Sequence, residues 1–384
     1  MPQQTDHLRV LLVTSLVAGG IGQHVRQLAR GLASRSQQIS VAAPQTVIEQ
    51  FQLHEFSDSA AAFEVGSRPS LAADRRALSA LTQRMVGQDV VHAHGVRAGA
   101  LAVFARRRLM ATEAQDIPAL VVTLHNAAPE RGLSRVIHQQ LQRVVAKGSD
   151  LILAVSPDLA AEITAGLDVA CELAVVPAVP KPREDLTPAQ AQALRTELGL
   201  GHDQTIFVTA ARLTRQKGLT RLLEAVARLA REQGPLNARW LIAGDGPDRA
   251  RLQARITNEG LPIDLLGHRT DVPSLLALAD VAVSAARWEG QPVWIQEALH
   301  AGCAIVATNV GGTNTVLAGA GWLVDGDDRG VASGLRYAFA ELLADPREQL
   351  AWAERARARS GQLPTADDAL DAVLLAYGSV GAAI

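Results

Sequence analysis

The sequence predicts an α/β protein with two doubly wound domains, each a parallel sheet that carries helices on both faces. Short, almost continuously apolar runs alternate with longer segments of helical periodicity, which is typical of such sheets. A proline-rich segment divides this alternation into two halves. The 384 residues also exceed what one hydrophobic core usually holds, so we expect two domains.

The first domain is expected to span residues 1–178. Two glycines follow its first apolar run, and residues 22–33 then have helical spacing. Apolar runs predict six strands in this domain, at or ending within residues 8–13, 39–43, 89–95, 120–125, 150–155 and 173–176.

A linker is predicted at residues 179–188, because prolines recur there among charged residues. The second domain is expected to span residues 189–360, and residues 361–384 predict a C-terminal helix that could cross back to the first domain. Apolar runs predict strands of the second domain at 205–210, 239–243, 263–266, 281–285, 304–307 and 322–324.

Composition excludes several classes of function. The net charge of −2 argues against a protein that binds nucleic acid. Cys171 and Cys303 lie far apart and outside any zinc motif, so we expect two core residues. No basic segment precedes the first apolar run, and no stretch approaches the ~18–20 apolar residues of a membrane span, so we expect a cytoplasmic protein.

The first loop carries Gly19, Gly20 and Gly22 between a strand and a helix. Glycines there let backbone amides approach an anion at the helix N-terminus. The loop does not read GxGxxG, and no acidic residue ends the second strand, so a nicotinamide or flavin site is disfavoured. A tight turn without a ligand remains the alternative.

A basic loop follows the first strand of the second domain. Its Arg212 and Lys217 would project from the carboxyl edge of the sheet, where a guanidinium and an ammonium suit a diphosphate. Lys217 is one of only three lysines in the chain, which favours a function over a solvated loop. Gly244 and Gly246, after the next strand, indicate a turn.

The segment from Trp288 to Gly302 is the most informative. Glu289 precedes Gly290, Gln291 and Pro292, and Glu297 follows in the helix predicted after this turn. The amides of residues 290–293 are expected at that helix N-terminus, aimed at a sugar or a phosphate. The two carboxylates could accept hydrogen bonds from hydroxyls of a sugar and of a ribose, or they could be ordinary surface charges.

These motifs together resemble family 4 of the retaining GT-B glycosyltransferases. They occur in the family's order over nearly the whole chain: Gly19-Gly20, Arg212 with Lys217-Gly218, Gly244-x-Gly246-Pro247, Leu266-Gly267, Asp271-Val272, Glu289-x7-Glu297 and Gly311-Gly312. The resemblance implies two Rossmann-like domains facing across a cleft, a nucleotide-sugar donor and no metal cofactor.

The resemblance also implies donor-binding roles in the second domain. Arg212 and Lys217 resemble the pair that grips the diphosphate, Glu297 the carboxylate on the ribose, and Glu289 the carboxylate facing the transferred sugar. The backbone from Gly267 to Arg269 resembles the wall against the base. Other residues expected to bind the donor are Gly20, whose amide resembles one that touches a phosphate, Gly244, Gly290, Gln291 and Pro292.

Two segments depart from the family's pattern. The last strand of the first domain is followed by Pro177-Ala-Val-Pro180, where the family often has Asn-Gly-Val-Asp. Gln291 stands where the family often has a large apolar residue, and it could offer an amide to the sugar. Both departures leave the sugar unassigned, and the nucleotide base and the acceptor are unassigned as well.

Histidines end two strands of the first domain. His125 resembles a cleft histidine close to the reacting centre. We expect His92 and His94 on opposite faces of their strand, with His94 on the acceptor side, His92 in the core and no metal bound between them. The acidic segment at Asp325–Asp328 is expected to be a turn and not a metal site.

Residues 131–147 predict a basic amphipathic helix. Such a helix could pack on its own sheet or contact anionic lipid at the inner face of a membrane. We therefore expect a bacterial retaining glycosyltransferase with an unidentified acceptor: a glycan, a lipid-linked molecule or a small-molecule hydroxyl. The alternatives are a GT-B nucleotide-sugar epimerase and a non-catalytic GT-B binding protein.

Overall fold

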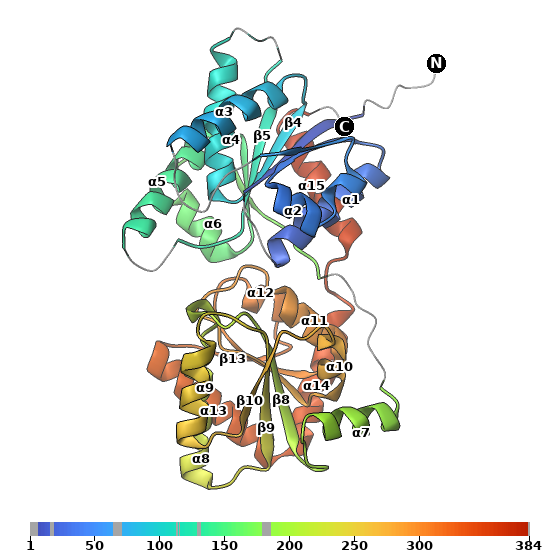
Figure 1. Ribbon diagram of the computed structural model, residues 1–384, viewed down its shortest axis with the longest axis vertical. Coiled ribbons are helices and arrows are strands. Elements are labelled where there is room, and N and C mark those ends of the chain that lie inside the picture. The colour runs from blue at the N-terminus through green and yellow to red at the C-terminus, as the bar shows by residue number, and fades with distance from the viewer. Residues whose placement is uncertain are drawn as a thin grey trace. The chain divides into compact units, whose positions relative to one another are not determined.

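The computed structural model describes residues 7–15, 19–63, 71–112, 114, 116–128, 132–178 and 186–382 (Figure 1). The chain divides into two compact units: residues 1–177 together with 364–384, and residues 178–363. Most of the predicted linker lies outside the described residues. Each unit is a parallel sheet with helices, so the predicted α/β class is confirmed.

The first unit contains a seven-stranded parallel sheet in the order β3-β2-β1-β4-β5-β6-β7. Five of these strands lie within one or two residues of their predicted positions, whereas β3 was not predicted and β7 ends earlier than expected. Their bounds are β1 Arg9–Thr14, β2 Gln38–Ala43, β3 Ser59–Ala62, β4 Val90–His94, β5 Ala119–Leu124, β6 Leu151–Ala154 and β7 Cys171–Leu173.

Helices cover both faces of this sheet. The first of them packs closely, because a Cβ at Gly22 would collide with the ring of Phe51. The helices are α1 Gly20–Ser34, α2 Gln45–Gln50, the 3-10 turn η1 Leu53–Phe56, α3 Leu71–Met85, α4 Val96–Met110, α5 Leu133–Gly148, α6 Pro157–Thr164 and α15 Ala366–Ser379.

The C-terminal helix α15 belongs to this first unit. It begins at a capping box made by Thr365 and Asp368. Leu370 of this helix packs against Gly31 of α1. The buried Tyr377 hydroxyl lies 2.8 Å from His92 Nδ1 on β4, so α15 is joined to the central part of the sheet.

The second unit contains a six-stranded parallel sheet in the order β10-β9-β8-β11-β12-β13. All six strands were predicted, with no end displaced by more than one residue. They are β8 Thr205–Ala210, β9 Ala238–Ala243, β10 Ile263–Gly267, β11 Val281–Ser284, β12 Ala304–Thr308 and β13 Trp322–Val324.

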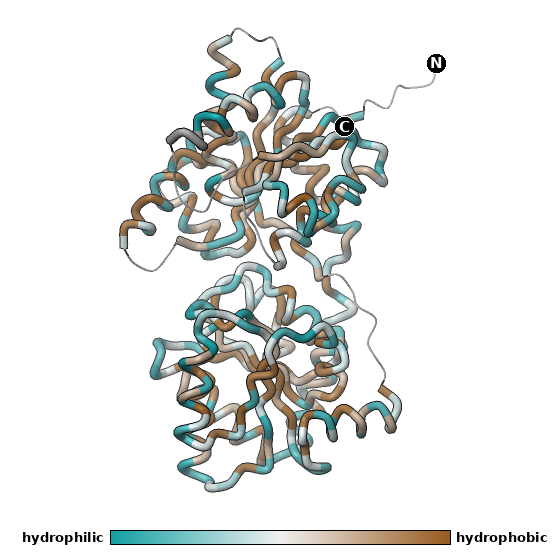
Figure 2. The backbone as a smooth tube through the Cα atoms, viewed as in Figure 1, coloured by the Kyte–Doolittle hydropathy of each residue, from teal (hydrophilic) through white to brown (hydrophobic). Residues whose placement is uncertain are grey.

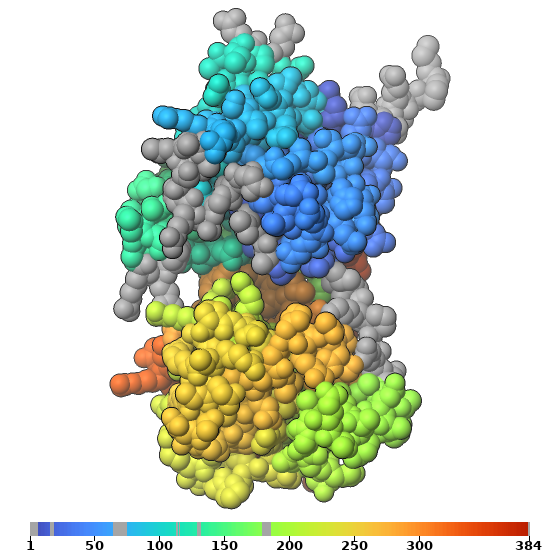
Figure 3. All heavy atoms as spheres, in the orientation of Figure 1, coloured from blue at the N-terminus to red at the C-terminus, as the bar shows by residue number. Residues whose placement is uncertain are grey.

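Helices again cover both faces of the sheet. Figure 3 shows α7 on the surface of this unit, where Leu194 is its buried residue. The helices are α7 Pro188–Glu197, the 3-10 turn η2 Arg215–Lys217, α8 Leu219–Gln233, α9 Arg249–Glu259, α10 Val272–Leu278, α11 Val293–Ala301, α12 Thr313–Leu317, α13 Asp328–Ala344 and α14 Pro346–Ser360.

The strands of the second unit are buried on both faces, as their apolar sequences predict (Figure 2). On one face Phe207 stacks on Trp240, with ring centroids 4.4 Å apart, and Phe339 of α13 meets both rings. The neighbouring Ile206 and Val208 enter the apolar cluster on the other face. The acidic segment before α13 is a turn whose Asp327 side chain caps that helix.

Both sheets reverse their strand order once, between β1 and β4 and between β8 and β11. The helices after the two strands at such a point lie on opposite faces of the sheet, which opens a crevice at the strands' carboxyl ends. Ligands of open α/β sheets bind there. Functional residues are therefore expected at the carboxyl edges of both sheets, next to these two points.

We expect Tyr377→Phe to lower the free energy of unfolding by about 1–2 kcal/mol, because it leaves a buried histidine nitrogen without its partner. Urea denaturation monitored by circular dichroism would measure the change. Tyr337→Phe is the matched control, because its ring is half exposed and it should change stability by less than about 0.5 kcal/mol. Equal effects of the two substitutions would contradict the contact between α15 and β4.

Candidate functional site

An ion pair lies at the carboxyl ends of β8 and β11. Lys217 ends the short turn η2 after β8, and Glu289 lies in the loop after β11. The Lys217 ammonium donates to Glu289 Oε1 over 2.6 Å, and the two side chains are 22% and 9% exposed. The structure thus joins the two residues that the sequence assigned to a diphosphate and to a transferred sugar.

Hydrogen bonds and a close backbone approach hold these two loops against each other. The Arg287 amide donates to the Gln216 carbonyl over 2.8 Å, and the Gln216 side-chain amide donates to the Trp288 carbonyl over 3.2 Å. Gly218 has a φ of +63°, and a Cβ there would collide with the Ala285 carbonyl oxygen. The close approach of the loops therefore requires glycine at position 218.

Two further glycines fix Glu289 from the β12 side. Gly311 has a φ of +55°, and a Cβ there would collide with the Glu289 carbonyl oxygen. The Gly312 amide donates to the carbonyls of Glu289 and Gly290 over 3.2 and 2.9 Å. The Glu289 carboxylate is therefore held by its backbone as well as by Lys217.

Arg212 is exposed in the loop that directly follows β8. The loop after β9 supports it: a Cβ at Gly244 would collide with the Ala211 carbonyl, and the Leu213 amide donates to the Asp245 carbonyl over 2.8 Å. The turn predicted at Gly244 thus sets the backbone on both sides of Arg212, in the same group of loops as Lys217.

The second carboxylate of the doubled-Glu segment lies on α11. This helix begins at Val293 with Pro292 as its N-cap, so its first turn starts later than the expected residues 290–293. Gln291 is half-buried in the turn before it, and Glu297 is half-buried within the helix. Glu297 lies one turn beyond the helix N-terminus.

Arg269 makes contacts that the sequence did not reveal. Its guanidinium donates to both Asp271 oxygens, over 2.7 and 2.6 Å, and to Glu197 over 2.9 Å. These hydrogen bonds, with Asp271 first and Glu197 next, raise the pKa of Arg269. Because two carboxylates hold the guanidinium, a contact with a nucleotide base would have to come from the backbone near Gly267.

Four histidines gather at the carboxyl edge of the first sheet. The His92 and His94 rings stack with centroids 4.3 Å apart, so the expectation that they lie on opposite faces is wrong, because residues two apart in a strand share a face. His94 Nδ1 lies 3.2 Å from His125 Nε2. His24 of α1 meets the rings of His94 and His125 edge-on, at 5.7 and 5.5 Å.

Sequence reasoning missed how His24 and Tyr377 take part in this cluster. His24 lies four residues after Gly20, on the buried face of α1, so helical periodicity could have predicted its position beside the sheet. Tyr377 comes from the far end of the chain, and no sequence pattern predicted its contact with His92. Gly20 begins α1 and is exposed, while residues 16–18 before it lie outside the described part of the chain.

Burial keeps all four imidazoles neutral near pH 7. It lowers the pKa of His24 to about 4, and burial together with the nearby His24 lowers the pKa of His92 to about 3. The pKa values of His94 and His125 fall well below the usual range, first through burial and then through neighbouring histidines. His94 is fully buried and His125 is 8% exposed, so His125 is the more accessible of the two.

Within the described ranges, no group of three or more His, Cys, Asp or Glu residues is arranged to hold a metal ion. The histidines stack and hydrogen-bond to one another instead of converging on one point. The search for membrane-spanning helices, limited to the same residues, found none of sufficient length and apolar character.

Comparison with known proteins adds to this geometry. The family model described as "Glycosyltransferase Family 4" matches residues 18–178, and the one described as "Glycosyl transferases group 1" matches residues 190–359. The solved structure of Anabaena HepE in complex with UDP-glucose superposes with a TM-score of 0.80 at 19% identity, covering 97% of this chain and 100% of that one. WaaG, a glycosyltransferase involved in lipopolysaccharide biosynthesis, has a TM-score of 0.68 at 17% identity, with 97% and 100% covered.

Two curated relatives are also similar in sequence. A GDP-mannose-dependent alpha-(1-6)-phosphatidylinositol dimannoside mannosyltransferase of Mycobacterium tuberculosis is 35% identical over 137 residues, which is 35% of each chain. A UDP-Gal:alpha-D-GlcNAc-diphosphoundecaprenol alpha-1,3-galactosyltransferase of Escherichia coli is 27% identical over 272 residues, 65% of each chain. The matches span about a third of the first relative and just under two thirds of the second.

The two doubly wound parallel sheets and the similarity to these solved glycosyltransferase structures identify the fold as GT-B. The chain belongs to glycosyltransferase family 4, as the resemblance of its motifs implied.

The histidine cluster makes stability depend on pH. Because the pKa of His24 is lower in the folded chain than the unfolded value near 6.5, the unfolded chain binds the extra proton between about pH 6.5 and 4, and stability falls as pH drops through that window. As the pH falls from 7 to 5, the free energy of unfolding should decrease in both proteins. We expect the decrease to be about 1–2 kcal/mol smaller in His24→Asn than in the wild type.

Urea denaturation at the two pH values would measure this difference. His202→Asn is the control, because the His202 side chain is 86% exposed, and it should keep the wild-type pH dependence. If His24→Asn follows the wild type as well, the neutral buried state of His24 is refuted.

Proposed function

We propose that this family 4 member is a retaining glycosyltransferase that takes its sugar from a nucleotide-diphosphate sugar. The observation that carries the proposal is the pair of Lys217 and Glu289 at the carboxyl edge of the second sheet, with Arg212 in the adjoining loop. The similarity of the fold to that of a protein solved with UDP-glucose supports a donor of this class.

The proposed donor site separates two tasks. The Lys217 ammonium and the exposed Arg212 guanidinium neutralise the diphosphate, which gains negative charge as the bond to the sugar breaks. Glu289, held beside Lys217, accepts hydrogen bonds from hydroxyls of the transferred sugar. Glu297 accepts hydrogen bonds from hydroxyls of the ribose. Gln291 offers its amide to the same sugar.

These cations do the work that a metal ion does in other transferases, so the proposed reaction needs no metal. The bond from the anomeric carbon to the phosphate oxygen breaks, and the bond to the acceptor oxygen forms on the same face of the sugar. The proton of the acceptor hydroxyl passes to the leaving phosphate. His125, neutral and hydrogen-bonded to His94, can orient a hydroxyl without adding charge.

Lys217→Ala should lower kcat/KM for sugar transfer by about 10³-fold or more, because it removes a charge from the transition state and leaves Glu289 buried without its partner. The donor is first identified by thermal shift with a panel of UDP- and GDP-sugars, and transfer is then assayed with that donor. Arg231→Ala, an exposed site on α8, should retain activity within twofold.

Three outcomes would contradict the proposal. Near-normal transfer by Lys217→Ala would refute the assignment of the diphosphate site. Activity lost in chelator and restored by Mn²⁺ would refute the metal-free reaction. Donor binding without transfer or hydrolysis would favour a non-catalytic binding protein.

We also infer that the acceptor is presented at an anionic membrane surface inside a bacterial cell. Two relatives act on phosphatidylinositol dimannoside and on a diphosphoundecaprenol-linked sugar, as their names state. In the first unit, α5 leaves Leu133, Val136 and Ile137 exposed at 75%, 52% and 38%. Its buried residues, Gln142, Val145 and Ala146, all lie in its second half. An exposed apolar turn on a basic helix suits the lipid interface.

The double variant Leu133→Ser with Val136→Ser should bind vesicles that contain phosphatidylglycerol at least fivefold more weakly than the wild type, because the inserted apolar area is lost. Flotation with vesicles would measure the bound fraction. Leu350→Ser with Leu375→Ser removes equally exposed residues elsewhere and should leave binding unchanged. Equal loss in both variants, or no binding by the wild type, would contradict this inference.

A further inference from the structure

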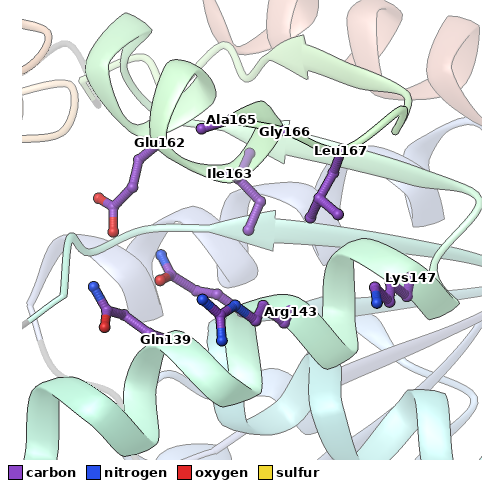
Figure 4. A pocket seen from close by; sticks show the side chains of 9 residues that line it. Gln139, Arg143, Lys147, Glu162, Ile163, Ala165, Gly166 and Leu167 are labelled. Carbon is purple, nitrogen blue, oxygen red and sulfur yellow. The ribbon is translucent and has the colours of Figure 1, made fainter.

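A cavity of about 520 Å³ lies between α5 and the end of α6 in the first unit (Figure 4). Its volume is in the range of small-molecule sites. Gln139, Arg143 and Lys147 occupy successive turns of α5 and line one wall. Figure 4 shows Glu162 and Ile163 on the opposite wall, which α6 provides.

This cavity is separate from the histidine cluster. Strand β6 starts three residues after α5 ends, and the turn at residues 165–167 leads into β7. Lys147 and Leu167 therefore lie toward the amino ends of these strands, whereas His125 directly follows the carboxyl end of β5. A ligand in the cavity would occupy a site other than the catalytic edge.

The walls of the cavity carry an excess of positive charge. Arg143 and Lys147 lie one turn apart and are exposed, and neither forms an ion pair with a carboxylate within the described ranges. Like charges at this spacing repel each other. Glu162 is the one carboxylate among the lining residues, so the site favours an anionic ligand.

A buried donor points to the same chemistry. Gln142 also lines the cavity and is 5% exposed, and its Nε2 has no hydrogen-bond acceptor among the described residues. Buried donors in proteins nearly always have an acceptor. A phosphate group supplies several acceptor oxygens and matches a guanidinium and an ammonium at the same time.

We propose that this cavity binds a phosphate ester. The phosphate lies against Arg143, Lys147 and the Gln142 amide, and the hydroxyls of the esterified alcohol meet Gln139 and Glu162. The ester reaches the site either as a soluble metabolite or as the headgroup of an anionic lipid. This binding is independent of the sugar transfer proposed at Lys217 and Glu289.

The test uses the full chain and two probes. Binding of glycerol 3-phosphate is measured by calorimetry, and binding to phosphatidylglycerol vesicles by flotation against phosphatidylcholine vesicles. The double variant Arg143→Gln with Lys147→Gln should weaken at least one of these at least tenfold. Arg107→Gln with Arg108→Gln removes the same charge from exposed positions on neighbouring α4 and should change binding less than twofold.

Gln142→Leu provides a second variant with its own readout. It should also weaken binding, while its thermal stability stays equal to or above that of the wild type, because an unpaired buried donor is removed. Hydrogen exchange measured with each probe that binds should show new protection in peptides covering residues 139–147 and 162–167.

Binding of glycerol 3-phosphate that the Arg143/Lys147 double variant weakens identifies a soluble ester. Vesicle binding that the same double variant weakens, without binding of glycerol 3-phosphate, identifies a lipid headgroup; either result supports the phosphate site. The proposal is overturned if neither probe binds, if both double variants lose binding equally, or if protection does not appear at the cavity. None of these results bears on transfer by Lys217 and Glu289, so the two proposals fail separately.

Discussion

The ion pair of Lys217 and Glu289 is the constraint on which the second unit's functional edge depends. Two nearly buried opposite charges are costly to desolvate, and they persist only where geometry fixes them close together. Here the geometry comes from two parallel strands and from glycines that allow three loops to meet. Each charge is the partner of the other, so the proposed donor site is assembled in the chain without a ligand.

The carboxyl edges of the two sheets differ in charge. The second unit holds full charges at its carboxyl edge, as a site for a diphosphate requires. The first unit holds four imidazoles that burial keeps neutral, so its carboxyl edge can orient hydroxyls without attracting a phosphate. Charge at one edge and neutral hydrogen bonding at the other match a charged donor and an acceptor hydroxyl.

The sequence predicted both sheets because buried parallel strands are almost continuously apolar and glycines mark the turns after them. It missed β3, whose four residues Ser59–Ala62 are small and mostly exposed. It proposed Lys217 and Glu289 as site residues through motif order, but it did not predict their contact across 72 positions. The prediction that His92 and His94 lie on opposite faces was wrong because the period of a strand is two residues, which places both side chains on the same face.

The contacts of Tyr377 and Arg269 could not be read from the sequence. Tyr377 reaches His92 from 285 residues away, and only the fold brings α15 beside the first sheet. Arg269 stands where a base-binding residue was expected, yet its partner Glu197 lies on α7, beyond any local pattern. Side-chain partners that come from distant elements depend on tertiary packing, which local propensity does not encode.

Helix α5 shows how one amphipathic pattern can serve two surfaces. Its sequence has one apolar stripe, but packing covers only the second half of that stripe, at Val145 and Ala146. The first half stays exposed, while Arg143 and Lys147 line a cavity on the flank. The chain's net charge of −2 carries no sign of this basic wall, because charges elsewhere offset it. Local placement of charge, and not the total, therefore decides which ligand this helix can meet.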